Sequence, residues 1–174
     1  MKTIQILKFS FIILLGLFVS HGASAQKAPE NRASPLDSVS GKVGQATISI
    51  KYSSPSVKGR KVWGSLVPYN QIWRAGANEA TVFTTDKDIT VEGKSLPAGS
   101  YAFFVIPVEE GDWTVIFNKT SNQWGAYKYD EKQDALRAKV KVKKTSPNER
   151  LTYRITPTGF SLLWEAIEIP VAIK

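Results

Sequence analysis

The segment Ser100–Asn118, SYAFFVIPVEEGDWTVIFN, decides the fold that we expect for this chain. Its first half, Ser100–Pro107, is apolar at both odd and even positions, which is typical of a strand buried on both faces of a sheet. Gly111 and Asp112 then interrupt the apolar run. In Trp113–Asn118 a large apolar side chain recurs at every second position, which is the period of a β-strand. The segment therefore predicts an antiparallel hairpin at the centre of a sheet.

Strand patterns continue on both sides of this hairpin. The further segments that we expect to be strands are Thr47–Tyr52, Arg137–Lys143, Leu151–Ile155, Phe160–Trp164 and Ile167–Ile173. Turn residues at Ser146–Asn148 and Thr158–Gly159 separate the segments of the C-terminal third. Pro170 cannot donate to a ladder, so we expect either that the last strand lies at an edge or that the missing N–H of Pro170 points outward. Short strands at this spacing indicate an all-β, mostly antiparallel domain, either a β-sandwich or a partly open barrel.

Helix signals are few. Val67–Trp73 is compatible with a single helical turn. In Asp130–Leu136 an aspartate suited to N-capping precedes good helix formers. We therefore expect one or two short helices beside the strands.

The first 25 residues have the pattern of a secretory signal peptide. Two lysines give a positive start, Phe9–Val19 is an apolar run too short to span a membrane, and Ala23–Ala25 is a small-x-small cleavage pattern. We expect cleavage after this pattern, and hence a periplasmic or secreted protein without a membrane span. The polar segment 26–35 predicts a flexible leader, and residues 36–174 predict a single domain.

The composition limits the chemistry that the mature chain can perform. Loss of the two signal lysines lowers the net charge from +8 to +6. The chain has no Cys, and its one His, His21, lies in the signal segment. Ser-His-Asp and Cys-His catalysis and metal sites built from thiolates or imidazoles are therefore excluded for the mature protein. We expect no metal and no cofactor, and the sequence assigns no catalytic residue and leaves enzymatic activity open.

The stretch Pro55–Ala80, PSVKGRKVWGSLVPYNQIWRAGANEA, gathers charged and aromatic residues without a clear period. Long irregular connections on a rigid β scaffold often carry function. An arginine beside a tryptophan suits planar or anionic ligands, because the guanidinium group pairs with carboxylate or phosphate and the ring stacks. The candidate ligand-binding residues are Lys58, Arg60, Trp73, Arg74, Asn78, Glu79 and Trp124.

Two interpretations of these candidates stay open. Gly76 is expected to let the chain fold back, so that Arg74, Asn78 and Glu79 reach one point. A cluster open to solvent would be a ligand site, whereas a buried cluster would make Arg74 and Glu79 a structural ion pair and the tryptophans core residues. Trp124 lies in NQWGAYKY, Asn122–Tyr129, which suits either a platform for sugar rings or packing at the rim of the domain.

Other charged groups have weaker functional interpretations. Glu79 with Asp86 or Asp88 could serve glycoside hydrolysis, but the two aspartates lie in a predicted turn. The lysines at 139, 141, 143 and 144 could bind an anionic polymer, but lysines on a solvent-facing strand also prevent edge-to-edge aggregation. They lack the aromatic residues or motifs of nucleic-acid binding, and we expect no nucleic-acid partner.

Several stretches together resemble the exported bacterial family catalogued as domain of unknown function 2911, which is common in Bacteroidetes. The stretches are Arg32–Gly44, Pro55–Thr81, Ser95–Pro107, Trp113–Lys119 and Tyr129–Arg137, and the most distinctive part is WRAGANEAT, Trp73–Thr81. The resemblance implies an exported, mostly β protein in which Arg74, Asn78 and Glu79 form a shared constellation. The family has no established activity, so the resemblance supplies no catalytic residues.

The leading hypothesis is a module that binds a small molecule or a glycan, either a saccharide or an anionic component of the cell envelope. The alternatives are a carboxylate-dependent glycan hydrolase and a structural or assembly factor of the envelope. A cleft that holds Glu79 with a second carboxylate would favour the hydrolase. A shallow aromatic groove with one charge would favour binding, and a flat face without a pocket would favour assembly.

Overall fold

The computed structural model describes residues 32–174, which form ten β-strands and one short 3-10 helix. The expected signal peptide and most of the expected leader lie outside these residues. No helix within residues 32–174 is long and apolar enough to cross a membrane.

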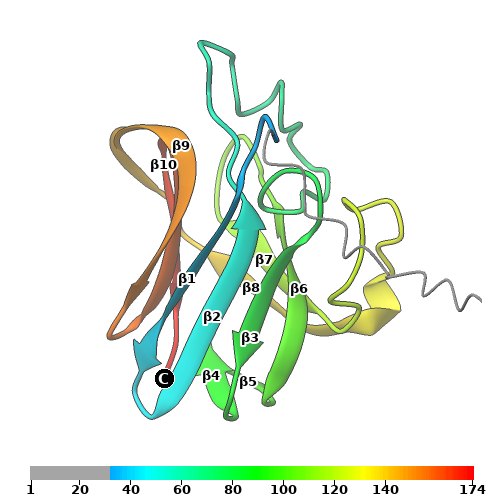
Figure 1. Cartoon of the computed structure of the whole chain (residues 1–174), viewed down its shortest axis with the longest axis vertical. Helices are drawn as coiled ribbons and strands as arrows, with labels where there is room; N and C mark the ends of the chain where they lie inside the picture. Colours follow the sequence, from blue (N-terminus) through cyan, green and yellow to red (C-terminus); the bar gives the residue numbers. More distant parts are fainter. Residues whose placement is uncertain (1–31) are drawn as a thin grey trace, which may run out of the picture.

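The largest sheet has six antiparallel strands in the order β1-β2-β3-β6-β7-β8 (Figure 1). Its strands are β1 Leu36–Val43, β2 Ala46–Ser53, β3 Thr81–Thr85, β6 Gly99–Ile106, β7 Trp113–Asn118 and β8 Asp134–Val140. A second sheet is the long hairpin of β9 Lys143–Thr156 and β10 Gly159–Ala172, and a small hairpin joins β4 Ile89–Val91 to β5 Lys94–Leu96. The predicted all-β, sandwich-like fold is confirmed, and the sheets do not close into a barrel.

The predicted central hairpin is strands β6 and β7, with Phe103 opposite Phe117. Strand β6 lies between β3 and β7 and is buried on both faces. Phe103 belongs to the main core, whereas Phe104 belongs to a smaller apolar cluster on the other face, where Ile72 and Tyr129 pack. This two-sided burial explains why the strand is apolar at every position from Tyr101 to Ile106.

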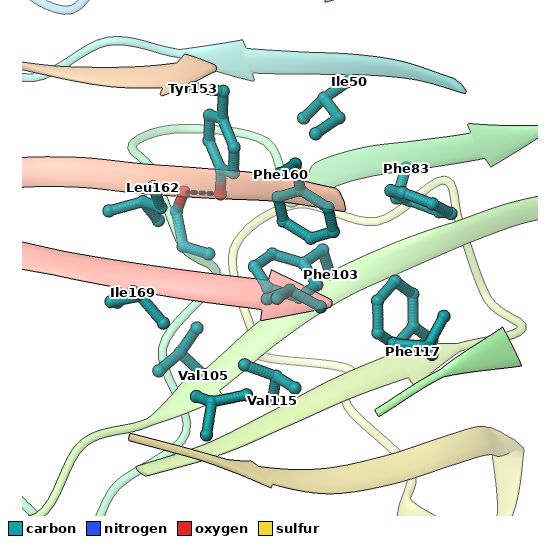
Figure 2. Packing of buried hydrophobic residues seen from close by; sticks show 14 of the residues in the cluster. Ile50, Phe83, Phe103, Val105, Val115, Phe117, Tyr153, Phe160, Leu162 and Ile169 are labelled. Atoms are coloured by element: carbon teal, nitrogen blue, oxygen red, sulfur yellow. Dashed lines mark hydrogen bonds between the residues drawn. The ribbon is translucent and has the colours of Figure 1, made fainter. Parts of the chain in front are cut away.

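The main core lies between the six-stranded sheet and the β9–β10 hairpin. Figure 2 shows Tyr153, Phe160 and Leu162 of the hairpin facing Phe103 and Phe117 of the sheet. The ring centroids of Phe103 and Phe160 are 5.4 Å apart in an edge-on arrangement. Such aromatic pairs add to the burial of apolar area in holding the two layers together.

The β9–β10 hairpin arches over itself, as the orange and red ribbon in Figure 1 shows. The arch brings the ends of β10 together, and the Ile173 amide donates to the Thr158 carbonyl at 2.9 Å. Gly159 sits at this closure with a φ of 145°, and a Cβ on it would lie 2.0 Å from the carbonyl oxygen of Val171. The closure therefore requires glycine at this position.

The predicted turn at Ser146–Asn148 is wrong, because these residues lie inside β9 and Asn148 pairs with Glu165 of β10. The polar, proline-containing sequence accompanies the arch of the hairpin, where the register shifts between Leu163 and Glu165. The turn at Thr158–Gly159 is confirmed. Pro170 lies past the last residue of β10 that pairs with β9, where its missing N–H is tolerated.

One of the two helix predictions is wrong, and the other is confirmed in part. Val67–Trp73 is irregular, because Trp73 is drawn into a bridge with Val105, in which each amide donates to the other's carbonyl at 2.8 Å. Asp130 does act as an N-cap and accepts from the Lys132 amide at 3.0 Å. The helix that it caps covers Glu131–Gln133 alone, because the following residues pair with β7 as strand β8.

Candidate functional site

The candidate region is the long connection of residues 54–80 between β2 and β3, which stands at the top of Figure 1. Long-range hydrogen bonds hold its second half against the sandwich. The Ala77 amide donates to the Ser53 carbonyl at 3.1 Å. The Tyr153 hydroxyl donates to the Ala75 carbonyl at 2.8 Å, the dashed bond of Figure 2. The loop is therefore a fixed part of the domain, although it has no regular secondary structure.

The backbone of this loop is strained at four non-glycine residues, Lys58, Asn70, Ala75 and Asn78, and the last two lie beside Arg74 and Glu79. Ala75 has a φ of 53° and Asn78 a φ of 56°, both in the left-handed region. Such conformations persist where surrounding contacts impose them, and they are common at binding sites. Gly76 does not provide the reversal that the sequence suggested; a Cβ on it would lie 3.1 Å from the Ser53 carbonyl oxygen, so glycine allows the loop to approach β2 closely.

A cavity of about 190 Å³ opens beneath this loop. Its lining residues are Ser34, Pro55, Arg60, Leu66, Val67, Trp73, Arg74, Gly76, Ala77 and Trp164. We call it the cationic cavity, because Arg60 and Arg74 line it and no carboxylate does. Three of the predicted residues, Arg60, Trp73 and Arg74, therefore lie together.

Arg74 is half-buried and has no ionic partner within residues 32–174. Its Nε atom is buried and finds no hydrogen-bond acceptor in that range. Burial lowers the pKa of Arg74, and the neighbouring Tyr127 acts in the opposite direction. An arginine stays charged under these conditions, so the site holds a partly desolvated cation with no anionic partner within residues 32–174.

The proposed ion pair between Arg74 and Glu79 is absent from the described part of the chain. Glu79 instead accepts two hydrogen bonds from Arg32, at 2.7 and 2.8 Å, and one from the Ser53 hydroxyl at 3.3 Å. Burial acts to raise the pKa of Glu79, but the bonds from Arg32 and Ser53 outweigh it and hold the pKa below its usual value. Sequence reasoning missed Arg32, because it lies in the expected leader.

Sequence reasoning also missed Trp164, which lines the cationic cavity. It lies on β10, it is 1% exposed, and its indole Nε1 has no hydrogen-bond partner within residues 32–174. Its ring stacks on that of Trp73 with centroids 5.8 Å apart. Trp63 packs edge-on against both rings, and its Nε1 is also unpartnered in that range. Buried indole N–H groups normally find an acceptor, so these two donors depart from the usual pattern within residues 32–174.

The two basic residues at the start of the loop behave differently. Arg60 lines the cationic cavity, and its Nε donates to the Val57 carbonyl at 2.9 Å, which fixes the guanidinium group. Lys58 is exposed, and its backbone amide donates to Glu149 at 3.0 Å. Lys58 lines none of the cavities described here, so the structure does not bring it to the other candidates.

Asn78 and Trp124 meet in a neighbouring cavity of about 300 Å³, which we call the aromatic cavity. Arg32, Ala33, Ser34, Asn78 and Trp124 line it. The Asn78 side chain donates to the Ser34 carbonyl at 3.3 Å, and the Asn78 carbonyl accepts from the Gly125 amide at 3.0 Å. Ser34 also lines the cationic cavity, so the two hollows share one wall.

Glu79 lines a third hollow, and it is the one carboxylate among the lining residues there. The other two carboxylates of the hydrolase hypothesis serve turns: Asp86 accepts from the Thr47 amide and Asp88 from the Ala98 amide, each at 2.7 Å. Glycoside hydrolysis needs two carboxyl groups across a sugar ring, one as acid and one as base or nucleophile. The three residues do not form such a pair.

The lysine row lines a separate and larger cavity of about 500 Å³ beside β8 and β10. Lys139, Lys141 and Lys143 face it together with Glu92 and Glu168. The lining of this cavity therefore mixes both signs of charge, whereas no carboxylate lines the cationic cavity. Within residues 32–174, no three acidic, histidine or cysteine side chains gather in a way that could hold a metal ion.

Comparison with known proteins found no match among curated proteins and none among solved structures. A protein family does match over residues 34–173, which include every residue of the two cavities except Arg32 and Ala33. The chain belongs to this family, described as "Protein of unknown function (DUF2911)".

Proposed function

We propose that this protein is a binding module that holds a small anionic ligand, a carboxylate or a phosphate, in the cationic cavity. The observation that carries the proposal is the half-buried Arg74, whose Nε lacks an acceptor and whose charge lacks a counter-ion within residues 32–174. A buried polar group without a partner costs about 1–3 kcal/mol, and a charged one costs more. An anion in the cavity would pair with Arg74 and remove that cost. The removal of this cost would contribute favourably to the free energy of binding.

The other donors of the cavity support the same ligand chemistry. A guanidinium group and an indole N–H donate hydrogen bonds and accept none. Arg60, Arg74 and Trp164, whose side chains carry only donors, line the hollow, and no carboxylate lines it. Arginine forks match the geometry of carboxylate and phosphate oxygens, and such charge-assisted bonds are about twice as strong as neutral ones. A neutral or cationic ligand would not form such charge-assisted hydrogen bonds with these donors.

The fixed geometry of the loop favours binding over a purely structural role for Arg74. The residues on both sides of Arg74 are held by the bonds of Trp73 to Val105 and of Ala75 to Tyr153. A preorganised site spends little free energy on ordering side chains when the ligand arrives. The N-terminal pattern adds the proposal that the module works after export, in the periplasm or outside the cell.

The test is a titration that follows the tryptophan fluorescence of the mature protein, because Trp73 and Trp164 line the cavity. The probes are inorganic phosphate, sulfate and citrate. We expect a saturable change with at least one probe and a loss of affinity of tenfold or more in Arg74→Gln. The matched control is Arg154→Gln on the exposed side of β9, which should bind as the wild type does. Equal binding by all three proteins, or binding by none, would overturn the proposal.

A further inference from the structure

Four large hydrophobic side chains stay exposed in the described part of the chain, and three of them lie at the site, whereas Leu36 lines the third hollow. They are Leu36, Leu66, Trp124 and Tyr127, with exposed fractions of 54%, 42%, 57% and 86%. Leu66 lines the cationic cavity and Trp124 the aromatic cavity. Tyr127 lies close enough to Arg74 to affect its pKa. Exposed apolar groups that cluster beside a polar site indicate a binding surface rather than scattered surface residues.

Trp124 is held in place although its ring is open to solvent. Its backbone forms a bridge with Glu79, and the next residue, Gly125, bonds to the Asn78 carbonyl. Gly125 has a φ of 63°, and a Cβ on it would lie 3.0 Å from the ring of Tyr127. The backbone that carries Trp124 is therefore fixed by a tight turn, and the indole ring offers a flat, largely exposed apolar face.

Planar polar groups surround this face. Arg32 and Asn78 line the aromatic cavity with Trp124, and the Asn78 amide offers both a donor and an acceptor. A sugar ring has one apolar face of C–H groups and a rim of hydroxyls that both donate and accept hydrogen bonds. An exposed indole beside amide and guanidinium groups matches that combination of an apolar face and a polar rim.

The two cavities are adjacent, which allows one ligand to occupy both. Ser34 lines both of them, and the Asn78 side chain is bonded to the Ser34 carbonyl between them. Arg74 and Asn78 both belong to the loop of residues 54–80, which hydrogen bonds hold against the sandwich. A ring on Trp124 would thus have the donor-rich cationic cavity next to it.

We infer that the ligand is an acidic saccharide, whose ring stacks on Trp124 and whose carboxylate or phosphate group enters the cationic cavity to meet Arg74. This inference rests on the proposed function, because it adds a sugar ring to the anion that the cationic cavity binds. The carboxylate of a uronic acid and the phosphate of a sugar phosphate have the same chemistry toward Arg74, so the test includes both.

The experiment is isothermal titration calorimetry of the mature protein with four probes. They are glucuronate, glucose 6-phosphate, methyl glucoside as the neutral sugar, and inorganic phosphate as the anion without a ring. We expect one of the two acidic sugars to bind at least tenfold more tightly than inorganic phosphate and than methyl glucoside. Trp124→Ala should remove that margin and leave the affinity for inorganic phosphate within twofold. Lys128→Ala, an exposed change in the same loop, is the control and should keep the margin.

The outcomes separate this inference from the proposed function. Binding of inorganic phosphate that depends on Arg74, with no gain from a sugar ring or no effect of Trp124→Ala, overturns the acidic saccharide and leaves the anion site standing. Equal affinity for methyl glucoside and glucuronate also overturns the inference, because the charge then contributes nothing. Absence of Arg74-dependent binding for every anionic probe contradicts the proposed function itself.

Discussion

The carboxylate of Glu79 accepts two hydrogen bonds from Arg32, at 2.7 and 2.8 Å, and this pairing leaves Arg74 without an anionic partner within residues 32–174. Glu79 lies five residues after Arg74, near enough in sequence for the two to pair, yet the loop directs them into different cavities. Because Glu79 pairs with Arg32, it helps to hold residues 32–35 against the domain. Arg74 is left available to a ligand.

The first prediction concerns the stability of a variant at Arg74. Arg74→Met keeps the apolar stem and removes a half-buried charge that has no ionic partner in the described residues. We expect the free energy of unfolding to stay within about 1 kcal/mol of the wild type or to rise, because residues placed for binding are often suboptimal for stability. Urea denaturation measures it. A loss of about 3 kcal/mol or more would show that Arg74 has a structural partner, as breaking a buried ion pair does.

The second prediction is a pH dependence of the Arg32–Glu79 pair. The pKa of Glu79 is lower in the folded protein than its usual value of 4.5. Its stabilising contribution is therefore complete above that usual value and is lost as the pH falls through the lower folded value. The difference in unfolding free energy between wild type and Glu79→Gln should accordingly be larger at pH 7 than at pH 3. A difference that is constant or grows toward acid pH would contradict the pairing.

The third prediction concerns the closure of the β9–β10 arch. Gly159→Ala should destabilise the fold by about 3 kcal/mol or more, since its Cβ would lie 2.0 Å from the Val171 carbonyl oxygen. Gly44→Ala is the control, because Gly44 also has a positive φ, of 59°, but no atom lies within 4 Å of its Cβ position. Thermal melts of both variants measure the loss of stability. The loss in Gly44→Ala reports the backbone strain alone, and the additional loss in Gly159→Ala reports the clash. Equal losses would mean that the arch is not closed as described.

The fourth prediction links the core to the site through Tyr153. Tyr153→Phe removes the hydroxyl that bonds to Ala75, which should cost about 1 kcal/mol of stability and weaken anion binding by loosening the loop. Tyr101→Phe is the matched control, because that hydroxyl bonds to the Pro97 carbonyl at 2.9 Å, away from the site. Both should lower the melting temperature, and the change at Tyr153 alone should lower affinity. A loss of affinity in both would point to a general effect of stability.

The sequence predicts the layers of the fold well, because burial on a pleated strand leaves a two-residue period. Strand β6 is recognisable from its apolar residues on both faces, and strand β7 from its alternation. The arch of the β9–β10 hairpin is not predictable in this way. Ser146–Asn148 has the composition of a turn, and only the pairing of Asn148 with Glu165 reveals that the strand continues. Local propensity is overridden there by a contact between distant segments.

The candidate site likewise combines residues that are predictable from the local sequence with residues that only tertiary contacts bring to it. The irregular loop with Arg60, Trp73 and Arg74 stands out in the sequence, because charge and aromatic residues occur there without a period. Trp164 and Arg32 come from segments more than 40 residues away from Arg74, and no spacing rule joins them to it. Their place in the site follows from the packing of β10 under the loop and from the docking of residues 32–35, which are tertiary contacts.

The most direct test of the central claim is an NMR titration that observes the Nε–H resonance of Arg74 and the indole Nε1–H resonance of Trp164. These two N–H groups are buried and have no acceptor within residues 32–174. When inorganic phosphate or glucuronate is added, both resonances should shift together and saturate at one concentration, while the indole resonance of Trp113, already bonded to the Val108 carbonyl, should not move. Saturable binding of either anion that leaves the Arg74 and Trp164 resonances unchanged would contradict the account.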